Sequence, residues 1–328
     1  MLFSVAGRAI LVKAHDDWSS EAVSQIFAGW FIHSLPDQPG LIPDATVAIH
    51  CGVSPPAPPD GLTSFDITND GTCFTDHKTY YARFGESLVI FGPGSTDEVN
   101  LWVDQQYDFA STVTVQLLSH ALSPALRRCG VFEIHSGAVI PVGHEDAIMI
   151  AGPSGSGKST LTSKLAQCGW GYVSDDIVLL RDIEQRLEIS AFRRFFALTG
   201  KTIAAAGLPQ KQSSSSVLAK VRVQPEEHFE HAPVERATPA SILFPTITHD
   251  ERTRIVSLTS AEAMSRLLRL CPWSSFDHPT SKEHLRMLGK LANTTNAFDL
   301  FAGQDVLEHP HRAAEAIYDS IGAAALIH

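Results

Sequence analysis

The sequence predicts an α/β fold in which helices flank a mixed sheet, preceded by a β-rich N-terminal domain. Apolar, β-branched segments of strand length recur along the chain, and segments with the 3–4 spacing of amphipathic helices lie between several of them. Strands and helices do not alternate strictly, which favours a mixed sheet over an all-parallel one. The strand patterns are densest near the start, so we expect domains at residues 1–105 and 106–328.

Bulk composition limits the classes of protein to be considered. A hydrophobic share of 44% over 328 residues is enough for a folded core. The net charge of −11 argues against nucleic-acid binding, which normally needs a basic surface. The five cysteines are scattered without a CxxC pair, as in proteins with reduced thiols. No signal peptide and no run long enough to span a bilayer is found, so we expect a cytoplasmic protein that binds no membrane.

The first 105 residues are expected to be mostly strand. Apolar residues recur with helical spacing only at residues 20–32. The proline-rich stretch at residues 53–61 is predicted to be a loop. Strands are predicted at residues 3–12, 47–49, 64–68, 72–75, 78–84, 88–91 and 99–103. Because this part contains no catalytic constellation, we expect it to serve recognition or oligomerisation.

The remaining residues show the patterns of a larger α/β domain. A helix is expected at residues 107–128, and the polar, serine-rich stretch at residues 207–217 is expected to be a mobile loop. Strands are predicted at residues 131–140, 147–151, 172–174, 177–180, 187–197, 241–244, 253–258 and 297–300. Further helices are predicted after residue 159 and at residues 261–270, 281–291 and 312–321.

One motif in this domain carries a specific chemistry. Residues 152–159 read Gly-Pro-Ser-Gly-Ser-Gly-Lys-Ser, which is a complete GxxxxGK[ST] P-loop between a predicted strand and a predicted helix. Glycines let successive backbone N–H groups surround phosphates, and the helix adds the positive end of its dipole. We therefore predict a nucleoside triphosphate site, with Lys158 on the phosphates and Ser159 on Mg²⁺. Its candidate residues are Gly152, Pro153, Ser154, Gly155, Ser156, Gly157, Lys158, Ser159 and Thr160.

Two positions compete for the acid that accompanies a P-loop. Asp175 and Asp176 follow a short strand, 17 and 18 residues after Lys158. Asp182 follows the apolar run at residues 177–180, as a Walker B acid does. The next strand of a P-loop sheet ends beside the γ-phosphate, which favours the Asp175–Asp176 pair. The alternative is that this pair only makes a tight turn. The tetrapeptide NKxD of guanine-specific GTPases is absent, and the choice between adenine and guanine stays open.

The stretch from His135 to Leu180 resembles the catalytic core of HPr kinase/phosphorylase and its HPr-kinase-like relatives. The matching features are His135 before a strand, the loop GxSGxGKS, and a Gly-aromatic-x-x-Asp-Asp element after one short helix. The resemblance implies a P-loop mixed sheet similar to that of phosphoenolpyruvate carboxykinase. It also implies that Asp176 accepts the proton of the attacking hydroxyl and that Asp175 and Ser159 hold Mg²⁺, although the two acids could exchange roles.

Further residues are candidates for a role at this site, and the resemblance bears on the first of them. It implies that His135 orients Asp176 or contacts the acceptor phosphate, whereas a histidine at the start of a buried strand can also be structural. Arg193, Arg194 and Lys201 are candidates for a second phosphate clamp, with a solvated basic patch as the alternative.

The sequence also departs from the family. Thr160 stands where the family has glutamate, and the late EVRGxG-type signature of bona fide HPr kinases is absent. Residues 1–105 do not resemble their N-terminal domain. The resemblance therefore implies a stand-alone relative that phosphorylates a serine of a peptide or protein other than HPr. Members of the family often form rings, so the resemblance also implies that this protein could be a homo-oligomer. The alternatives are a regulatory nucleotide-binding module with slow ATP hydrolysis and a small-molecule kinase.

Overall fold

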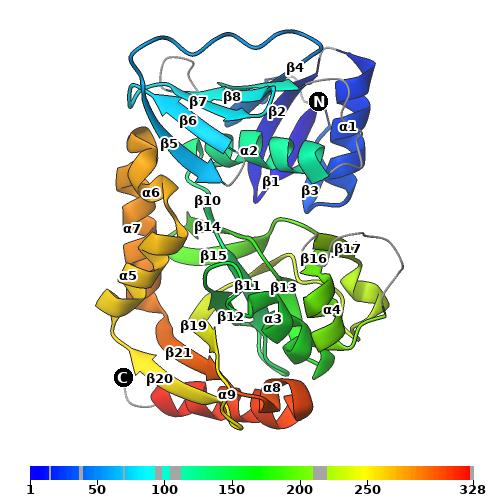
Figure 1. Cartoon of the computed structure of the whole chain (residues 1–328), viewed down its shortest axis with the longest axis vertical. Coiled ribbons are helices and arrows are strands. Elements are labelled where there is room, and N and C mark those ends of the chain that lie inside the picture. The colour runs from blue at the N-terminus through cyan, green and yellow to red at the C-terminus, as the bar shows by residue number, and fades with distance from the viewer. Residues whose placement is uncertain are drawn as a thin grey trace. The chain divides into compact units, whose positions relative to one another are not determined.

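The computed structural model describes residues 1–14, 16–36, 40–68, 71–92, 98–103, 112–209 and 220–325. The chain divides into two compact units (Figure 1). Unit 1 comprises Met1–Phe132 and Trp273–His284, and unit 2 comprises Glu133–Pro272 and Leu285–His328. This division differs from the boundary expected at residue 105. Helix α2 (Thr112–Arg128) belongs to unit 1, because it packs on the sheet of that unit.

Unit 1 is built on a nine-stranded sheet with the order β3-β1-β2-β4-β9-β8-β7-β6-β5. Strand β4 is parallel to both β2 and β9, and the other pairs are antiparallel. The strands are β1 (Leu2–Val5), β2 (Arg8–Ala14), β3 (Ile32–Ser34), β4 (Ala45–Cys51), β5 (Thr63–Thr68), β6 (Gly71–Thr75), β7 (Tyr80–Phe84), β8 (Ser87–Phe91) and β9 (Glu98–Val103).

Helices and a buried ion pair complete unit 1. Helix α1 (Asp17–Ala28) begins after Asp16, whose carboxylate accepts a hydrogen bond from the Ser19 amide, as an N-cap does. Helix α2 packs on β9, β4 and β8. Arg127 of α2 pairs with Asp277 at 2.9 Å, and both side chains are almost fully buried. Asp277 lies between helix α6 (Trp273–Phe276) and helix α7 (His278–Thr294).

Unit 2 contains a six-stranded mixed sheet, which confirms the predicted α/β class with a mixed sheet. Its order is β13-β11-β12-β19-β21-β20. Strands β12, β19 and β21 are parallel neighbours, and the other pairs are antiparallel. The strands are β11 (Ser136–Ile140), β12 (Ala147–Ala151), β13 (Gly171–Ser174), β19 (Pro239–Ile247), β20 (Arg254–Leu258) and β21 (Asn296–Ala302).

Two smaller sheets accompany it. A four-stranded sheet contains β10 (Phe132–Ile134), β14 (Val178–Ile183), β15 (Arg186–Ala191) and β18 (Arg236–Ala237) in the order β10-β14-β15-β18. Strands β16 (Phe196–Thr199) and β17 (Lys220–Val223) form an antiparallel pair. The expected strand at residues 187–197 is therefore two strands that lie in different sheets.

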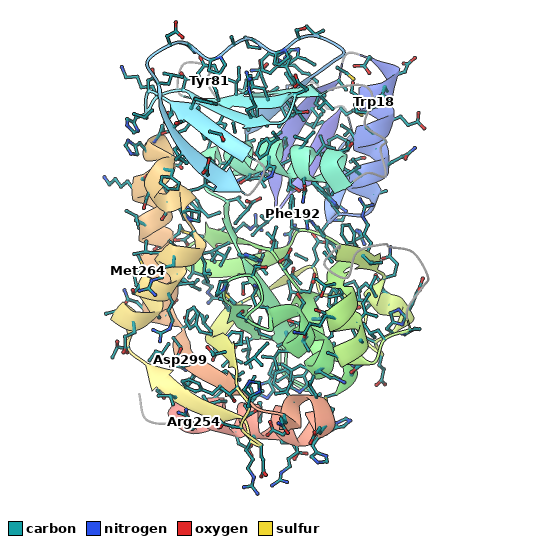
Figure 2. The ribbon with its side chains drawn as sticks, in the orientation of Figure 1. Trp18, Tyr81, Phe192, Arg254, Met264 and Asp299 are labelled. Carbon is teal, nitrogen blue, oxygen red and sulfur yellow. The ribbon has the colours of Figure 1, made fainter. Side chains whose placement is uncertain are left out.

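Helices cover the mixed sheet of unit 2. They are α3 (Lys158–Gln167), α4 (Gly200–Ala206), α5 (Ser260–Leu270), α8 (Asp305–Glu308) and α9 (Pro310–Ala325), with a 3-10 turn at Pro225–Glu227. Apolar side chains of α3 and α9 join those of β12 and β21 in one buried core. Arg266 of α5 pairs with Asp299 of β21 at 2.6 Å. Figure 2 shows Asp299 and, on the neighbouring strand β20, Arg254.

Some sequence predictions fall on residues that are not described. Gly207 caps the end of helix α4 with a left-handed φ of 69°, but residues 210–217 of the expected loop lie outside the described residues. The same holds for residues 107–111 of the helix expected at 107–128. In the described part of the chain, no helix has the length and apolar character needed to cross a membrane.

Candidate functional site

The predicted site residues meet at one edge of the mixed sheet. Strand β11 is antiparallel to β12 and to β13, so β12 and β13 both end at the edge where β11 begins. The register places Ser136 opposite Ala151 and Ala138 opposite Ser174. His135, the glycine-rich loop (residues 152–157) and the acid pair Asp175–Asp176 therefore all leave the sheet at the same edge.

The order of the strands that carry these residues differs from the expected order. The sequence predicts that the strand before Asp175 lies beside the strand before the loop, but in the structure β11 lies between β13 and β12. The two strands still run in the same direction, because each is antiparallel to β11. Their carboxyl ends are thus one strand apart at the same edge.

The glycine-rich loop joins β12 to α3, as the sequence predicts. Gly157 caps the helix in the left-handed conformation, with φ of 98°, which other residues adopt only with strain. The loop is exposed at Pro153, Ser154 and Gly155, whereas Gly152 is buried and Ser156, Ser159 and Thr160 are half-buried. Because α3 begins directly after the loop, the positive end of its dipole faces the loop. No side chain caps the first turn of the helix.

Lys158 folds back on the loop that precedes it. Its Nζ donates hydrogen bonds to the backbone oxygens of Gly152 at 2.7 Å and of Pro153 at 2.9 Å. The residue is only 5% exposed. A buried ammonium is costly unless its protons are hydrogen-bonded, and these two carbonyls supply hydrogen-bond acceptors. Lys158 is therefore held at the loop by backbone oxygens.

Ser159 connects the loop to the acid pair. Its hydroxyl donates a hydrogen bond of 3.3 Å to the backbone oxygen of Asp175. The Asp175 carboxylate is buried and accepts a hydrogen bond from the Ala197 amide at 3.2 Å. Ser174 fixes the turn that carries both acids, since its hydroxyl accepts from the amides of Asp176 and Ile177. The acid pair is therefore anchored to the loop, to β16 and to its own turn.

Asp176 makes a different set of contacts. Its Oδ1 lies 2.7 Å from Nε2 of His135, and its Oδ2 lies 4.0 Å from Nη1 of Arg193. The His135 side chain is 37% exposed, whereas that of Asp176 is 13% exposed. The carboxylate is thus oriented by a partner on each oxygen, and His135 reaches solvent. This is an arrangement in which a base can be held in place and approached from outside.

Asp182, the competing acid, occupies another environment. It lies on β14 in the four-stranded sheet, and it pairs with Lys290 at 2.7 Å and Arg286 at 3.3 Å. Burial alone would raise the pKa of Asp182, but the hydrogen bonds and charges of Lys290 and Arg286 lower it overall. Two cations already neutralise this carboxylate, so its contacts are those of a structural ion pair.

The donor atoms near the loop suit Mg²⁺. The described residues contain no group of three or more His, Cys, Asp or Glu that could hold a metal ion. Mg²⁺ does not need such a cage, because it is usually held by one or two carboxylates together with phosphate oxygens and water. The Ser159 hydroxyl and the Asp175 carboxylate are oxygen ligands of the kind that Mg²⁺ prefers. The two residues are in contact, because the Ser159 hydroxyl donates to the backbone oxygen of Asp175.

The structure adds residues that sequence reasoning missed. The amide of Ala197 donates a hydrogen bond to the Asp175 carboxylate. Every residue except proline has such an amide, so the sequence does not show which one will make this contact. Ile247 ends β19 and is 61% exposed, and a Cβ on Gly157 would lie 3.1 Å from it. The strand expected at residues 241–244 stops short of Ile247, so the sequence carries no signal that this side chain lies beside Gly157.

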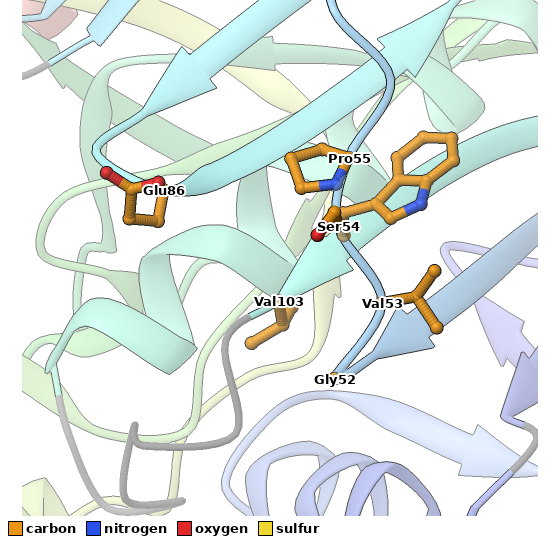
Figure 3. Close-up of a pocket in the computed structure, with 7 residues that line it drawn as sticks. Gly52, Val53, Ser54, Pro55, Glu86 and Val103 are labelled. Atoms are coloured by element: carbon orange, nitrogen blue, oxygen red, sulfur yellow. The ribbon is translucent and has the colours of Figure 1, made fainter.

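Unit 1 has a pocket of its own, of about 240 Å³ (Figure 3). Pro55, Glu86 and Trp102 are among the residues that line it, and Glu86 is the one titratable side chain among the described lining residues. A single carboxylate with an indole and a proline does not form a catalytic constellation.

Comparisons with known proteins give a distant similarity. No family model matches the chain, and no curated protein matches it. Among solved structures, the chain is similar to the Hpr(Ser) kinase/phosphatase from Coxiella burnetii, with 12% sequence identity and a TM-score of 0.33. The match covers 58% of this chain and 98% of that one. This is a distant relationship in fold at most.

Proposed function

We propose that this protein is an ATP- and Mg²⁺-dependent kinase that transfers the γ-phosphate to a serine hydroxyl of a peptide or protein. The observation that carries the proposal is the position of Asp176. It is held by His135 at 2.7 Å, and it directly follows Asp175, whose backbone oxygen accepts a hydrogen bond from Ser159 beside the glycine-rich loop. A candidate base, a candidate metal ligand and a P-loop motif are therefore connected by contacts.

In the proposed mechanism, the loop binds the triphosphate. The uncapped first turn of α3 offers N–H groups and a positive dipole end to the phosphates. Lys158 exchanges its carbonyl partners, Gly152 and Pro153, for phosphate oxygens. Ser159 and Asp175 would hold Mg²⁺, which when bound would neutralise charge on the β- and γ-phosphates.

Asp176 is the proposed general base. It takes the proton of the serine hydroxyl while the serine oxygen forms a bond to the γ-phosphorus. The bond from that phosphorus to the β–γ bridging oxygen breaks, and ADP leaves with the electron pair. His135 keeps the Asp176 carboxylate oriented during the transfer. Positioning and charge stabilisation are what phosphoryl transfer chiefly requires, and these residues supply both.

Incubation with Mg²⁺-ATP tests the proposal. The acceptors would be serine-containing peptides encoded next to this gene and, as a comparison, HPr. Mass spectrometry is expected to find one added phosphate on a serine of a peptide, and none when Asp176→Asn replaces the wild-type chain. ADP formation without any phosphorylated peptide would contradict the proposal and favour a regulatory module. Phosphate on a small metabolite alone would contradict the peptide acceptor.

A further inference from the structure

Two arginines approach one buried aromatic ring next to the acid pair. The guanidinium carbon of Arg193 lies 6.0 Å from the centroid of the Phe195 ring, and that of Arg222 lies 5.1 Å from it. Phe195 is 5% exposed and serves as a common platform. Attraction to a ring face helps to hold a guanidinium in place.

The β16–β17 pair brings Arg222 to this position. Arg222 lies on β17 directly opposite Ala197 of β16, and opposite residues of a strand pair point to the same face. The amide of Ala197 is also the group that donates to the Asp175 carboxylate. The strand pair that anchors Asp175 therefore carries Arg222 as well, although Arg222 is 47 residues away in the sequence.

The two guanidinium groups lie close enough for the charge of one to act on the other. Arg193 lies 4.0 Å from Asp176, whose other carboxylate oxygen contacts His135. Partial burial, and after it the positive charge of Arg193, lower the pKa of Arg222. Arginine stays protonated at neutral pH, so two positive charges lie beside the Asp175–Asp176 pair and repel each other. An anion bound between them would relieve this repulsion.

We propose that Arg193 and Arg222 bind an oxyanion of the acceptor, a carboxylate or a phosphate, close to the serine that receives the phosphoryl group. This inference rests on the proposed kinase function and specifies its substrate as a serine with an acidic neighbour. Planar guanidinium groups bind carboxylate and phosphate oxygens through paired N–H donors. The net charge of −11 for the whole chain does not prevent this, because contact charges act within a few ångströms and distant ones are screened.

A phosphate titration tests the arginine site without any catalysis. Inorganic phosphate would be titrated calorimetrically into Lys158→Ala, in which the triphosphate loop has lost its lysine. Adding Arg222→Gln is expected to weaken phosphate binding about tenfold, the usual size of one charge-assisted hydrogen bond. Adding Arg222→Lys should weaken it less, and Arg186→Gln, a change at an exposed arginine of β15, should have no effect. An affinity that Arg222→Gln leaves unchanged would overturn the inference.

Acceptor peptides test the same site during turnover. Three peptides would differ only in the residue next to the serine, as glutamate, phosphoserine or glutamine. We expect the glutamate or the phosphoserine peptide to have a KM about tenfold below that of the glutamine peptide, and Arg222→Gln to remove the difference without changing the KM for ATP. The lower of the two KM values identifies the oxyanion. Equal KM values for all three would overturn the inference. Failure to phosphorylate any peptide would contradict the kinase function, while the phosphate titration would still judge the arginine site.

Discussion

The hydroxyl of Ser159 donates a hydrogen bond of 3.3 Å to the backbone oxygen of Asp175. Ser159 lies on α3, which follows β12, and Asp175 lies in the turn after β13. Strand β11 separates β12 from β13 in the sheet. The contact shows that the glycine-rich loop and the acid pair form one constellation.

Replacing Lys158 by alanine is expected to weaken the binding of Mg²⁺-ATP strongly. The triphosphate would lose the ammonium that the loop holds at its side, and a hydrogen bond to a charged group contributes about 1.5–3 kcal/mol, roughly tenfold to a hundredfold in affinity. Calorimetric titration would measure this. Lys164→Ala, on the same helix, serves as the control and should bind as the wild type does. Equal affinity in Lys158→Ala would remove the basis for a nucleotide site here.

Replacing Asp176 by asparagine should separate binding from chemistry. The change keeps the size of the side chain and leaves the loop intact, so the affinity for ATP should stay within a few fold. Loss of a general base typically lowers the rate by about 10²–10⁴-fold. His135→Gln should lower it less, because the base itself remains. Single-turnover transfer would be measured for these variants and for Asp175→Asn. Full activity in Asp176→Asn with loss in Asp175→Asn would reverse the roles of the two acids.

Replacing Asp182 by asparagine should affect stability and leave nucleotide binding unchanged. Asp182 pairs with Lys290 and Arg286, and removing partly exposed pairs of this kind costs about 1 kcal/mol. We therefore expect a slightly lower free energy of unfolding and an ATP affinity within twofold of the wild type. Denaturant unfolding and calorimetry would measure the two quantities. A large loss of Mg²⁺-dependent ATP binding would instead assign Asp182 to the metal.

Replacing Gly137 by alanine should destabilise the protein. A Cβ at this position would lie 2.6 Å from Oγ1 of the buried Thr162 and 3.2 Å from the backbone oxygen of Ser174. Overpacking of this kind costs about 1–3 kcal/mol. Gly289→Ala is the control, because a Cβ there meets nothing within 4 Å in the middle of α7, and it should stabilise by about 0.5–1 kcal/mol. Thermal unfolding would compare them, and equal stability of the two variants would contradict the predicted clash.

His284 should make stability depend on pH. The residue is 2% exposed, and neither ring nitrogen has a hydrogen-bond partner among the described residues. Burial, and after it the positive charge of Arg127, lower its pKa from 6.5 to about 4, although Asp277 acts in the opposite direction. The unfolded chain therefore binds a proton that the folded chain excludes. The stability contributed by neutral His284 is complete above pH 6.5 and falls by about 1.4 kcal/mol per pH unit between pH 6.5 and pH 4.

Denaturant unfolding across this pH range would test the effect of His284. His284→Leu should show a flatter dependence than the wild type, because no imidazole remains to be protonated on unfolding. The exposed His309→Leu serves as the control and should keep the wild-type slope. If His284→Leu and the wild type lose stability in parallel, His284 is not the group responsible.

The sequence by itself determined the local elements of the site. The apolar run before Gly152 and the helical pattern after Ser159 predicted β12 and α3, because strand and helix periodicity are properties of neighbouring residues. The same reasoning predicted that Asp175 and Asp176 follow a short strand, and that strands and helices build a mixed sheet. The P-loop motif likewise marked Lys158 and Ser159, since its chemistry depends on residues that are contiguous in the chain.

Only the tertiary structure decided which distant residues meet. Helix α2 joined unit 1 because its buried face fits that sheet, and β11 took the place beside β12 that β13 was expected to occupy. The contacts of Asp175 with Ala197 and of Arg222 with Phe195 depend on strand pairing between segments far apart in sequence. Strand order and register follow from the packing of the whole core, which no short stretch of residues encodes.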